Sequence, residues 1–143
     1  MGHLRAIHYH LFQDLYDWAG LLRTVEISKG SEQFQLRRFL ETGMADIHRR
    51  LERDNFLKGS NAAVFCHKAG EILGDVNYVH PFREGNGRTQ LQYLKQLAEQ
   101  AGHPIDLTRL PAVGRIEASR DAHQTRYEPL SRAIRAALKP DGI

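Results

Sequence analysis

The residues best suited to chemistry stand together between His80 and Arg88, in the order His-Pro-Phe-Arg-Glu-Gly-Asn-Gly-Arg. The stretch combines an imidazole, a carboxylate, two glycines that flank an amide, and an arginine. Imidazole exchanges protons near neutral pH, and carboxylates bind hard cations such as Mg²⁺. These groups together predict a site for a nucleotide polyphosphate, because core packing has no need of them.

The two glycines precede a predicted helix and indicate an anion site. Gly85 and Gly87 leave backbone N–H groups unshielded, at the helix end that carries a partial positive charge. Asn86 can add a side-chain donor, and Arg88 in the first helical turn can bond two phosphate oxygens at once. We therefore expect these four residues to bind phosphates.

Two other residues of the stretch have the chemistry for catalysis. Glu84 stands directly before the anion site, and Mg²⁺ typically takes one or two carboxylates together with phosphate oxygens and water. His80 stands just before it in the chain and can take the proton from an attacking hydroxyl group. Phe82 is expected to bury its ring and anchor the loop. Each residue alone is compatible with a purely structural role, but the ordered set favours chemistry.

Composition places these residues in one domain. The chain has 143 residues, 41% of them hydrophobic, and no apolar run approaches the roughly 20 residues of a membrane span. Cys66 is the only cysteine, which excludes an internal disulfide and fits a reducing, cytoplasmic setting. The net charge is +3, but arginines alternate with acids, as in residues 49–54, which argues for solvated helix faces and against nucleic-acid binding.

The spacing of apolar residues predicts a mainly α domain. Asn61 after Ser60 is a good helix cap, and Gly102 a good helix stop. The predicted helices cover residues 3–18, 32–54, 61–79, 88–101, 113–124 and 127–138.

One short segment has a β pattern instead. Val25 and Ile27 alternate with polar residues directly before Lys29 and Gly30, which favours a strand followed by a turn. A hairpin is therefore expected between the first two helices.

The first helix is rich in aromatic and histidine residues. His3, His8 and His10 are spaced too irregularly for a metal site, so we expect them on the surface. Tyr16 and Trp18 are expected to be packing residues beneath the hairpin.

Together these features resemble the Fic (filamentation induced by cAMP) domain family, whose signature is H-x-F-x-[DE]-G-N-G-R-x-x-R. Residues 80–88 match the signature, and residues 11–20 with 23–30 are similar to the family's first helix and β-hairpin flap. The resemblance extends to the family's C-terminal helices, through Ser119, Ala122, Tyr127 and Leu130. The resemblance implies a single Fic-type helical domain over residues 1–143, with one β-hairpin flap.

The resemblance also implies a protein adenylyltransferase (AMPylator), which moves AMP from Mg²⁺·ATP to a Ser, Thr or Tyr hydroxyl of a target protein and releases pyrophosphate. His80 would be the general base, Glu84 the Mg²⁺ ligand, and residues 85–88 the phosphate site. A target backbone would bind as an added strand along the flap, which consists of Val25, Glu26, Ile27, Ser28, Lys29 and Gly30. Such a toxin-like enzyme would act in the bacterial cytoplasm, or in a host cell as a delivered effector.

The chain departs from the family signature at Leu91, where the pattern has a second arginine. In the family this arginine orients the γ-phosphate and pairs with the glutamate of an inhibitory helix. We therefore expect weaker ATP binding and a lost anchor for inhibition; alternatively, Leu91 only continues the apolar stripe of its helix and activity survives. A different donor nucleotide, and a module that binds nucleotide without transferring it, are the remaining alternatives.

An internal inhibitory motif of the family, [ST]-x-x-x-E-[GN], is not expected. Ser28 and Glu32 have the spacing, but Gln33 follows them. The chain begins close to the first helix, which leaves no room for a preceding inhibitory helix, so a separate antitoxin-like partner or an N-terminal truncation is the alternative. The intact Gly85-Asn86-Gly87 favours AMP transfer, because kinase-like relatives have lysine at the second glycine.

Overall fold

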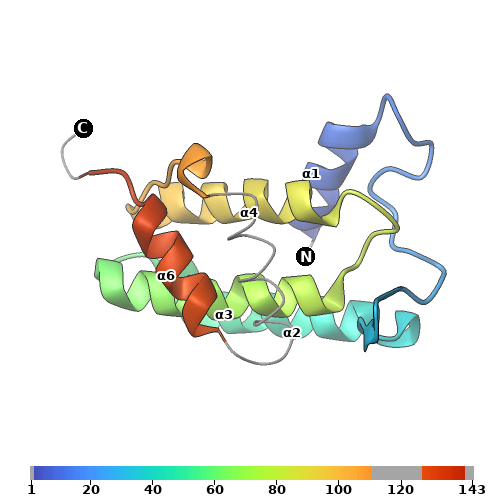
Figure 1. Ribbon diagram of the computed structural model, residues 1–143, viewed down its shortest axis with the longest axis horizontal. Helices are drawn as coiled ribbons and strands as arrows, with labels where there is room; N and C mark the ends of the chain where they lie inside the picture. The colour runs from blue at the N-terminus through green and yellow to red at the C-terminus, as the bar shows by residue number, and fades with distance from the viewer. Residues whose placement is uncertain (1, 111–126, 141–143) are drawn as a thin grey trace.

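The computed structural model describes residues 2–110 and 127–140, and these form a bundle of helices (Figure 1). A central helix, α3, spans Ala62–Val79. It packs against α2 (Leu40–Arg53), α4 (Asn86–Ala101) and α6 (Glu128–Ala137), and α1 (Gly2–Phe12) packs against α4. The prediction of a mainly α fold is confirmed.

α3 is buried between its neighbours, and local sequence sets its start. The side chain of Asn61 accepts the backbone N–H of Val64 at 2.9 Å, as a helix cap does. Phe65 and Ala69 are completely buried within the helix, and Phe82 is completely buried just beyond it. The prediction that Phe82 anchors its loop through its ring is therefore confirmed.

The first helix is shorter than predicted. α1 ends at Phe12 rather than at residue 18, and residues 13–20 form turns. The turns bring Tyr16 against Trp18, whose rings stack with centroids 4.3 Å apart. The apolar spacing continues through residue 18, but these aromatic contacts take the chain away from the helix axis.

Residues 32–39 are not α-helical, and this part of the prediction is wrong. They form the strand β2 (Glu32–Gln33), an extended segment and the 3-10 turn η1 (Arg37–Phe39). The backbone N–H of Phe34 donates to the carbonyl of Ile27 at 3.1 Å, and that of Gln35 donates to the carbonyl of Tyr78 at 3.0 Å. These bonds to other segments replace the bonds of a helix, so tertiary context overrides the local pattern.

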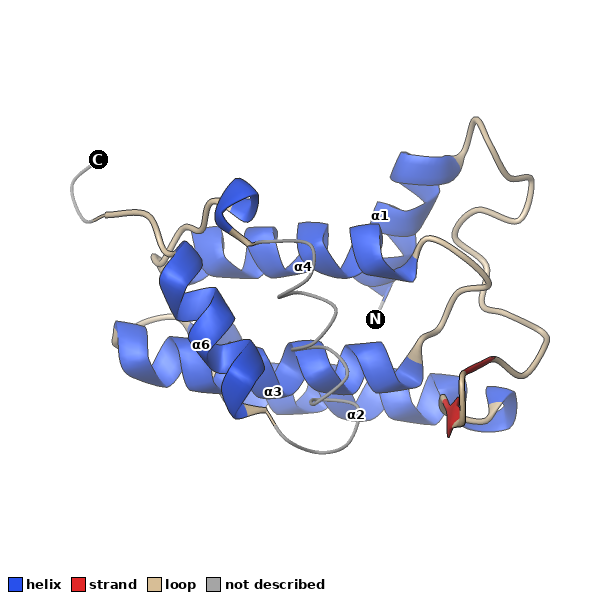
Figure 2. Cartoon of the chain, in the orientation of Figure 1, coloured by secondary structure: helices blue, strands red, loops and turns tan. Residues whose placement is uncertain are grey.

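The hairpin is confirmed but is short. β1 (Ser28–Lys29) pairs antiparallel with β2, so that Ser28 faces Gln33. Val25 and Ile27 precede the paired strand instead of belonging to it. Figure 2 shows the two strands at the end of the bundle that lies away from α6.

The remaining predictions about helices have mixed outcomes. α4 begins at Asn86, slightly earlier than expected, and ends before Gly102 as predicted. α6 confirms the predicted last helix, whereas the helix predicted over 113–124 lies outside the described residues. In the described part of the chain, no helix combines the length and the apolar character needed to cross a bilayer.

Candidate functional site

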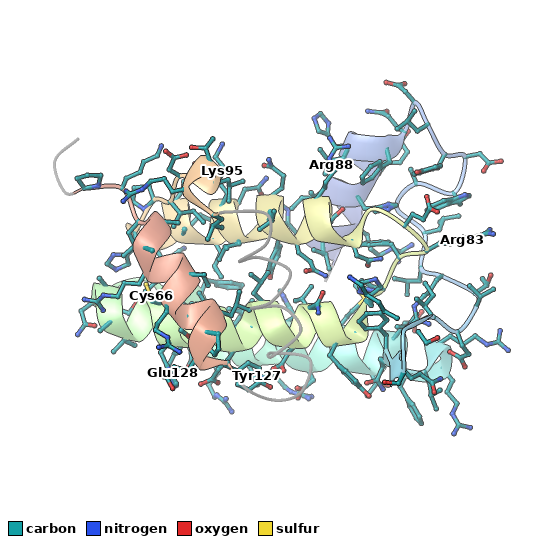
Figure 3. All side chains as sticks on the ribbon, in the orientation of Figure 1. Cys66, Arg83, Arg88, Lys95, Tyr127 and Glu128 are labelled. Atoms are coloured by element: carbon teal, nitrogen blue, oxygen red, sulfur yellow. The ribbon has the colours of Figure 1, made fainter. Side chains whose placement is uncertain are left out.

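The residues predicted for catalysis, metal and phosphate lie on the site loop, defined here as residues 80–88, which comprises the connection from α3 and the first residues of α4 (Figure 1). Figure 3 shows Arg83 projecting outward from this loop, and Arg88 on the first turn of α4 beside α1. The residues of the site loop therefore lie between the C-terminal end of α3 and the N-terminal end of α4. The predicted flap, residues 25–30, lies at the same end of the bundle, in and before the hairpin (Figure 2).

Asn86 closes the loop through its side chain. Its Oδ1 accepts the backbone N–H of Phe82 at 3.0 Å, and its Nδ2 donates to the carbonyl of Phe82 at 2.6 Å. The residue is 4% exposed. The sequence predicted a side-chain donor for phosphate here, but the structure uses the amide to hold the loop, which leaves the backbone N–H as the group for an anion.

The two glycines differ in what surrounds them. Gly85 caps α4 with φ +82°, and a Cβ added there would lie 2.6 Å from Cζ of Phe12. Gly87 lies within the first turn of α4, and beyond its own turn of helix an added Cβ would meet no atom of the described residues within 4 Å. The space in front of Gly87 is therefore open, while Gly85 is needed by the fold.

His80 ends α3 in the left-handed conformation, with φ +48°. Its Nδ1 lies 3.2 Å from the carbonyl oxygen of Asn77. Because a carbonyl only accepts, Nδ1 carries the proton and the neutral ring has its lone pair on Nε2. The ring also stacks on Phe34, with centroids 3.9 Å apart and planes 9° from parallel. The tautomer and the stacking suit Nε2 to act as a proton acceptor.

Glu84 is held at its backbone and at its carboxylate by residues that sequence reasoning did not assign to the site. The carbonyl oxygen of Glu84 accepts a bond from Nε2 of His8 at 2.8 Å. The phenol of Tyr16 donates to Oε2 of Glu84 at 2.9 Å, and this bond raises the pKa of Tyr16. The end of α1 and the turns after it thus fix the direction of the Glu84 side chain.

The prediction that His8 lies on the surface is wrong. His8 is completely buried and stacks on Phe82, with ring centroids 3.9 Å apart. Its Nδ1 accepts the backbone N–H of Gly20 at 2.8 Å, so Nε2 carries the proton of the neutral ring. Burial lowers the pKa of His8. A signal existed in the sequence, because His8 shares the four-residue spacing of Leu4 and Phe12 on the buried side of α1.

Arg23 is the other functional candidate that the sequence did not single out. Its side chain is completely buried between the hairpin and the site loop. The guanidinium donates to the carbonyl oxygens of His80 and Val25, each at 2.7 Å, and to that of Val79 at 3.2 Å. Its backbone N–H donates to the carbonyl of Pro81 at 2.9 Å. Burial lowers the pKa of Arg23, and the nearby carboxylate of Glu26 opposes this by favouring the charged form.

Leu91 is half-buried and packs against the hydrophobic core. The packing part of the simpler interpretation, a continued apolar stripe, is therefore confirmed for this position.

Comparisons with known proteins agree with this architecture. Residues 1–98 match the model of the Fic/DOC family. Over 138 residues the chain is 37% identical to "Protein adenylyltransferase VbhT" of Bartonella schoenbuchensis, an alignment that covers 96% of this chain and 29% of that protein. Over 138 residues it is 35% identical to "Probable protein adenylyltransferase y4lH" of Sinorhizobium fredii, covering 96% of this chain and 72% of that protein.

The fold is also similar to a solved structure, the N-terminal Fic domain of a Bartonella quintana cell filamentation protein with bound ADP. The TM-score is 0.89 at 25% identity, and the match covers 99% of this chain and 73% of that chain. The chain thus spans under a third of the Bartonella schoenbuchensis protein but most of the other two. On these matches, the chain belongs to the Fic/DOC family.

Proposed function

We propose that this domain transfers AMP from Mg²⁺·ATP to a hydroxyl side chain of a target protein. One observation carries the proposal: His80, whose Nδ1 lies 3.2 Å from the carbonyl oxygen of Asn77, shares a single short loop with the helix start at Gly87. The adenylyltransferase names of two relatives and the ADP bound to the Bartonella quintana domain support it.

His80 would act as the general base. Nε2 takes the proton of the target hydroxyl while the hydroxyl oxygen forms a bond to the α-phosphorus of ATP. The bond between that phosphorus and the oxygen bridging to the β-phosphate breaks, and pyrophosphate leaves with the bridging oxygen. The imidazole holds the proton and later gives it to solvent, so the base is regenerated.

The start of α4 would bind the phosphates. Backbone N–H groups at a helix N-terminus point outward and lie at the positive end of the helix dipole. The open space at Gly87 lets an anion approach them, and the exposed Arg88 adds a guanidinium, which lies 5.2 Å from the centroid of the Phe12 ring. A bound phosphate would also offset the unfavourable placement of this cation at a helix start.

Glu84 would hold Mg²⁺. Its carboxylate is exposed and oriented by Tyr16. Within residues 2–110 and 127–140, no group of three or more His, Cys, Asp or Glu side chains is arranged to hold a metal ion. The single carboxylate of Glu84 fits Mg²⁺, which would complete its shell with phosphate oxygens and water. When bound, the ion would neutralise phosphate charge.

The target protein would bind along the hairpin. A two-stranded sheet leaves backbone groups available for an added strand, and Val25 beside it is 45% exposed. The Bartonella quintana protein is a VirB-translocated effector, which supports a host cell as one place of action. A separate antitoxin-like inhibitor belongs to the same proposal.

A second candidate is a module that binds nucleotide without transferring AMP. Leu91 favours it, because an apolar side chain packed on the core stands where the family signature has an arginine. This candidate predicts that ligand at about 100 times its Kd stabilises the fold by roughly 2.7 kcal/mol while no target is modified.

Mass spectrometry of a lysate incubated with Mg²⁺·ATP and the protein tests the proposal. We expect peptides that carry AMP on Ser, Thr or Tyr, and we expect none with His80→Ala. His67→Ala is the matched control, because the side chain of this exposed histidine pairs with Glu71 on its own helix. AMP-bearing peptides formed equally well by His80→Ala would rule out the assigned base.

A further inference from the structure

A single buried cation joins the hairpin to the site loop. The guanidinium of Arg23 donates to the carbonyls of Val25 and Gln35, which lie on the two arms of the hairpin segment. The same guanidinium donates to the carbonyls of Val79 and His80, at the end of α3. The two parts of the site are far apart in sequence, and one side chain bonds both.

The chemistry of arginine explains why this residue type stands here. A buried cation is costly unless it is hydrogen-bonded, and the guanidinium has five N–H donors in a rigid fork. Glu26, the carboxylate paired with Arg23 at 3.5 Å, is itself 45% exposed in its side chain. The guanidinium is further compensated by four backbone carbonyls, including those at the negative C-terminal end of α3.

His80 depends on these bonds for its conformation. A residue other than glycine with φ +48° is held in a conformation that its own side chain disfavours. Arg23 bonds the carbonyl of His80 and the carbonyl before it, so it fixes the two peptide groups that set the direction of the ring.

The hairpin depends on the same bonds. Arg23 holds Val25 on one arm and Gln35 on the other, and Phe34 next to Gln35 stacks on the imidazole of His80. The hairpin and the base are therefore in contact directly through the rings and indirectly through the guanidinium.

We propose that Arg23 is a positioning residue that fixes the imidazole of His80 and the target-binding hairpin relative to each other. The proposal rests on the proposed function, in which a target strand pairs with the hairpin and its hydroxyl gives a proton to His80. It assigns to Arg23 no contact with ATP, because the predicted phosphate site lies at the start of α4.

The variant Arg23→Lys tests the proposal, because lysine keeps the charge but cannot bond carbonyls of both segments with a planar fork. The first readout is the imidazole ¹⁵N spectrum, in which wild-type His80 should show a proton on Nδ1 and the variant a mixture of tautomers. The second readout is AMP transfer, in which kcat should fall about 10- to 100-fold from misplacement of the base. KM for ATP should stay within about twofold, because the loss lies outside the nucleotide site.

Arg109→Gln is the matched control. Arg109 belongs to the short 3-10 helix Leu107–Arg109 after α4, and its guanidinium donates to the carbonyl of Leu138, directly after α6, at 2.9 Å. This variant should keep the wild-type imidazole spectrum and kcat.

A folded Arg23→Lys protein with a wild-type kcat, or with a lower kcat and an unchanged His80 spectrum, would overturn the proposal. If AMP transfer is absent even from the wild type, the proposed function fails, and the imidazole spectrum still decides whether Arg23 positions His80.

Hydrogen exchange of the wild-type protein supplies a test that does not require the variant to fold. The backbone N–H of Arg23 donates to the carbonyl of Pro81, and that of Gln35 donates to the carbonyl of Tyr78. The backbone N–H of His80 donates to the carbonyl of Val76. If Arg23 joins the two segments, these amides should open together, with protection factors that agree within about threefold. Opening of the Gln35 amide about a hundredfold more often than that of His80 would contradict the proposal.

Discussion

The substitution Gly87→Ala should separate nucleotide binding from folding, with Gly85→Ala as its counterpart. Beyond its own turn of helix, a Cβ at position 87 meets no atom within 4 Å in the described part of the chain, so we expect the fold to accept it without strain. The methyl group would, however, stand in the space through which a phosphate reaches the N–H groups at the start of α4.

The structure sets opposite expectations for the two glycines. Gly87→Ala lies inside a helix and should leave stability unchanged or raise it by about 0.5–1 kcal/mol. Loss of one charge-assisted bond to phosphate, about 1.5–3 kcal/mol, should weaken binding of Mg²⁺·ATP roughly ten- to a hundredfold. Gly85→Ala should cost about 1–2 kcal/mol for its φ of +82° and about 1–3 kcal/mol for the collision with Phe12.

Urea unfolding and calorimetric titration with Mg²⁺·ATP measure the two effects on the same samples. The expected result is a stable Gly87→Ala protein with weak binding, and a destabilised Gly85→Ala protein. Wild-type affinity in a stable Gly87→Ala protein would refute an anion site at the start of α4.

Three further predictions concern the neighbours of the site. Leu91→Arg should tighten Mg²⁺·ATP binding roughly ten- to a hundredfold by restoring a phosphate contact, and equal affinities in calorimetry would contradict this expectation. Tyr16→Phe removes the donor to Oε2 of Glu84 and should raise the Mg²⁺ concentration for half-maximal transfer by roughly tenfold; an unchanged Mg²⁺ titration would show that Tyr16 does not orient this carboxylate. Burial lowers the pKa of His8 in the folded state. Below a pH of about 6.5, His8 therefore binds a proton in the unfolded chain but not in the folded protein. The free energy of unfolding of the metal-free protein should therefore fall more steeply between pH 7 and 5 in the wild type than in His8→Gln, and parallel curves would argue against this role.

Local sequence signals predicted the helices and the site loop well where one side chain decides the outcome. Asn61 caps α3, Phe82 is buried, and Gly102 ends α4, as their residue types indicate. The order of residues 80–88 also located the site loop, because few structural needs call for that combination.

The parts that could not be predicted depend on contacts between distant segments. The periodicity of residues 32–39 favours a helix, but Phe34 and Gln35 form backbone bonds with Ile27 and Tyr78. The hydrogen bond from Tyr16 to Glu84 joins residues that are 68 positions apart, and no local sequence pattern predicts it. Arg23 was visible only as one residue of the flap-like stretch, because nothing in a sequence shows which carbonyls a buried guanidinium will bond.

The central claim is that His80 removes a proton so that the α-phosphate of ATP, and not the γ-phosphate, passes to a protein hydroxyl. The most direct test uses two ATP samples, labelled at the α- or at the γ-phosphate, with a purified target protein and with wild type or His80→Ala. We predict label on the target only from α-labelled ATP and only with the wild type. Transfer of the γ-label, or transfer of the α-label by His80→Ala at the wild-type rate, would contradict the account.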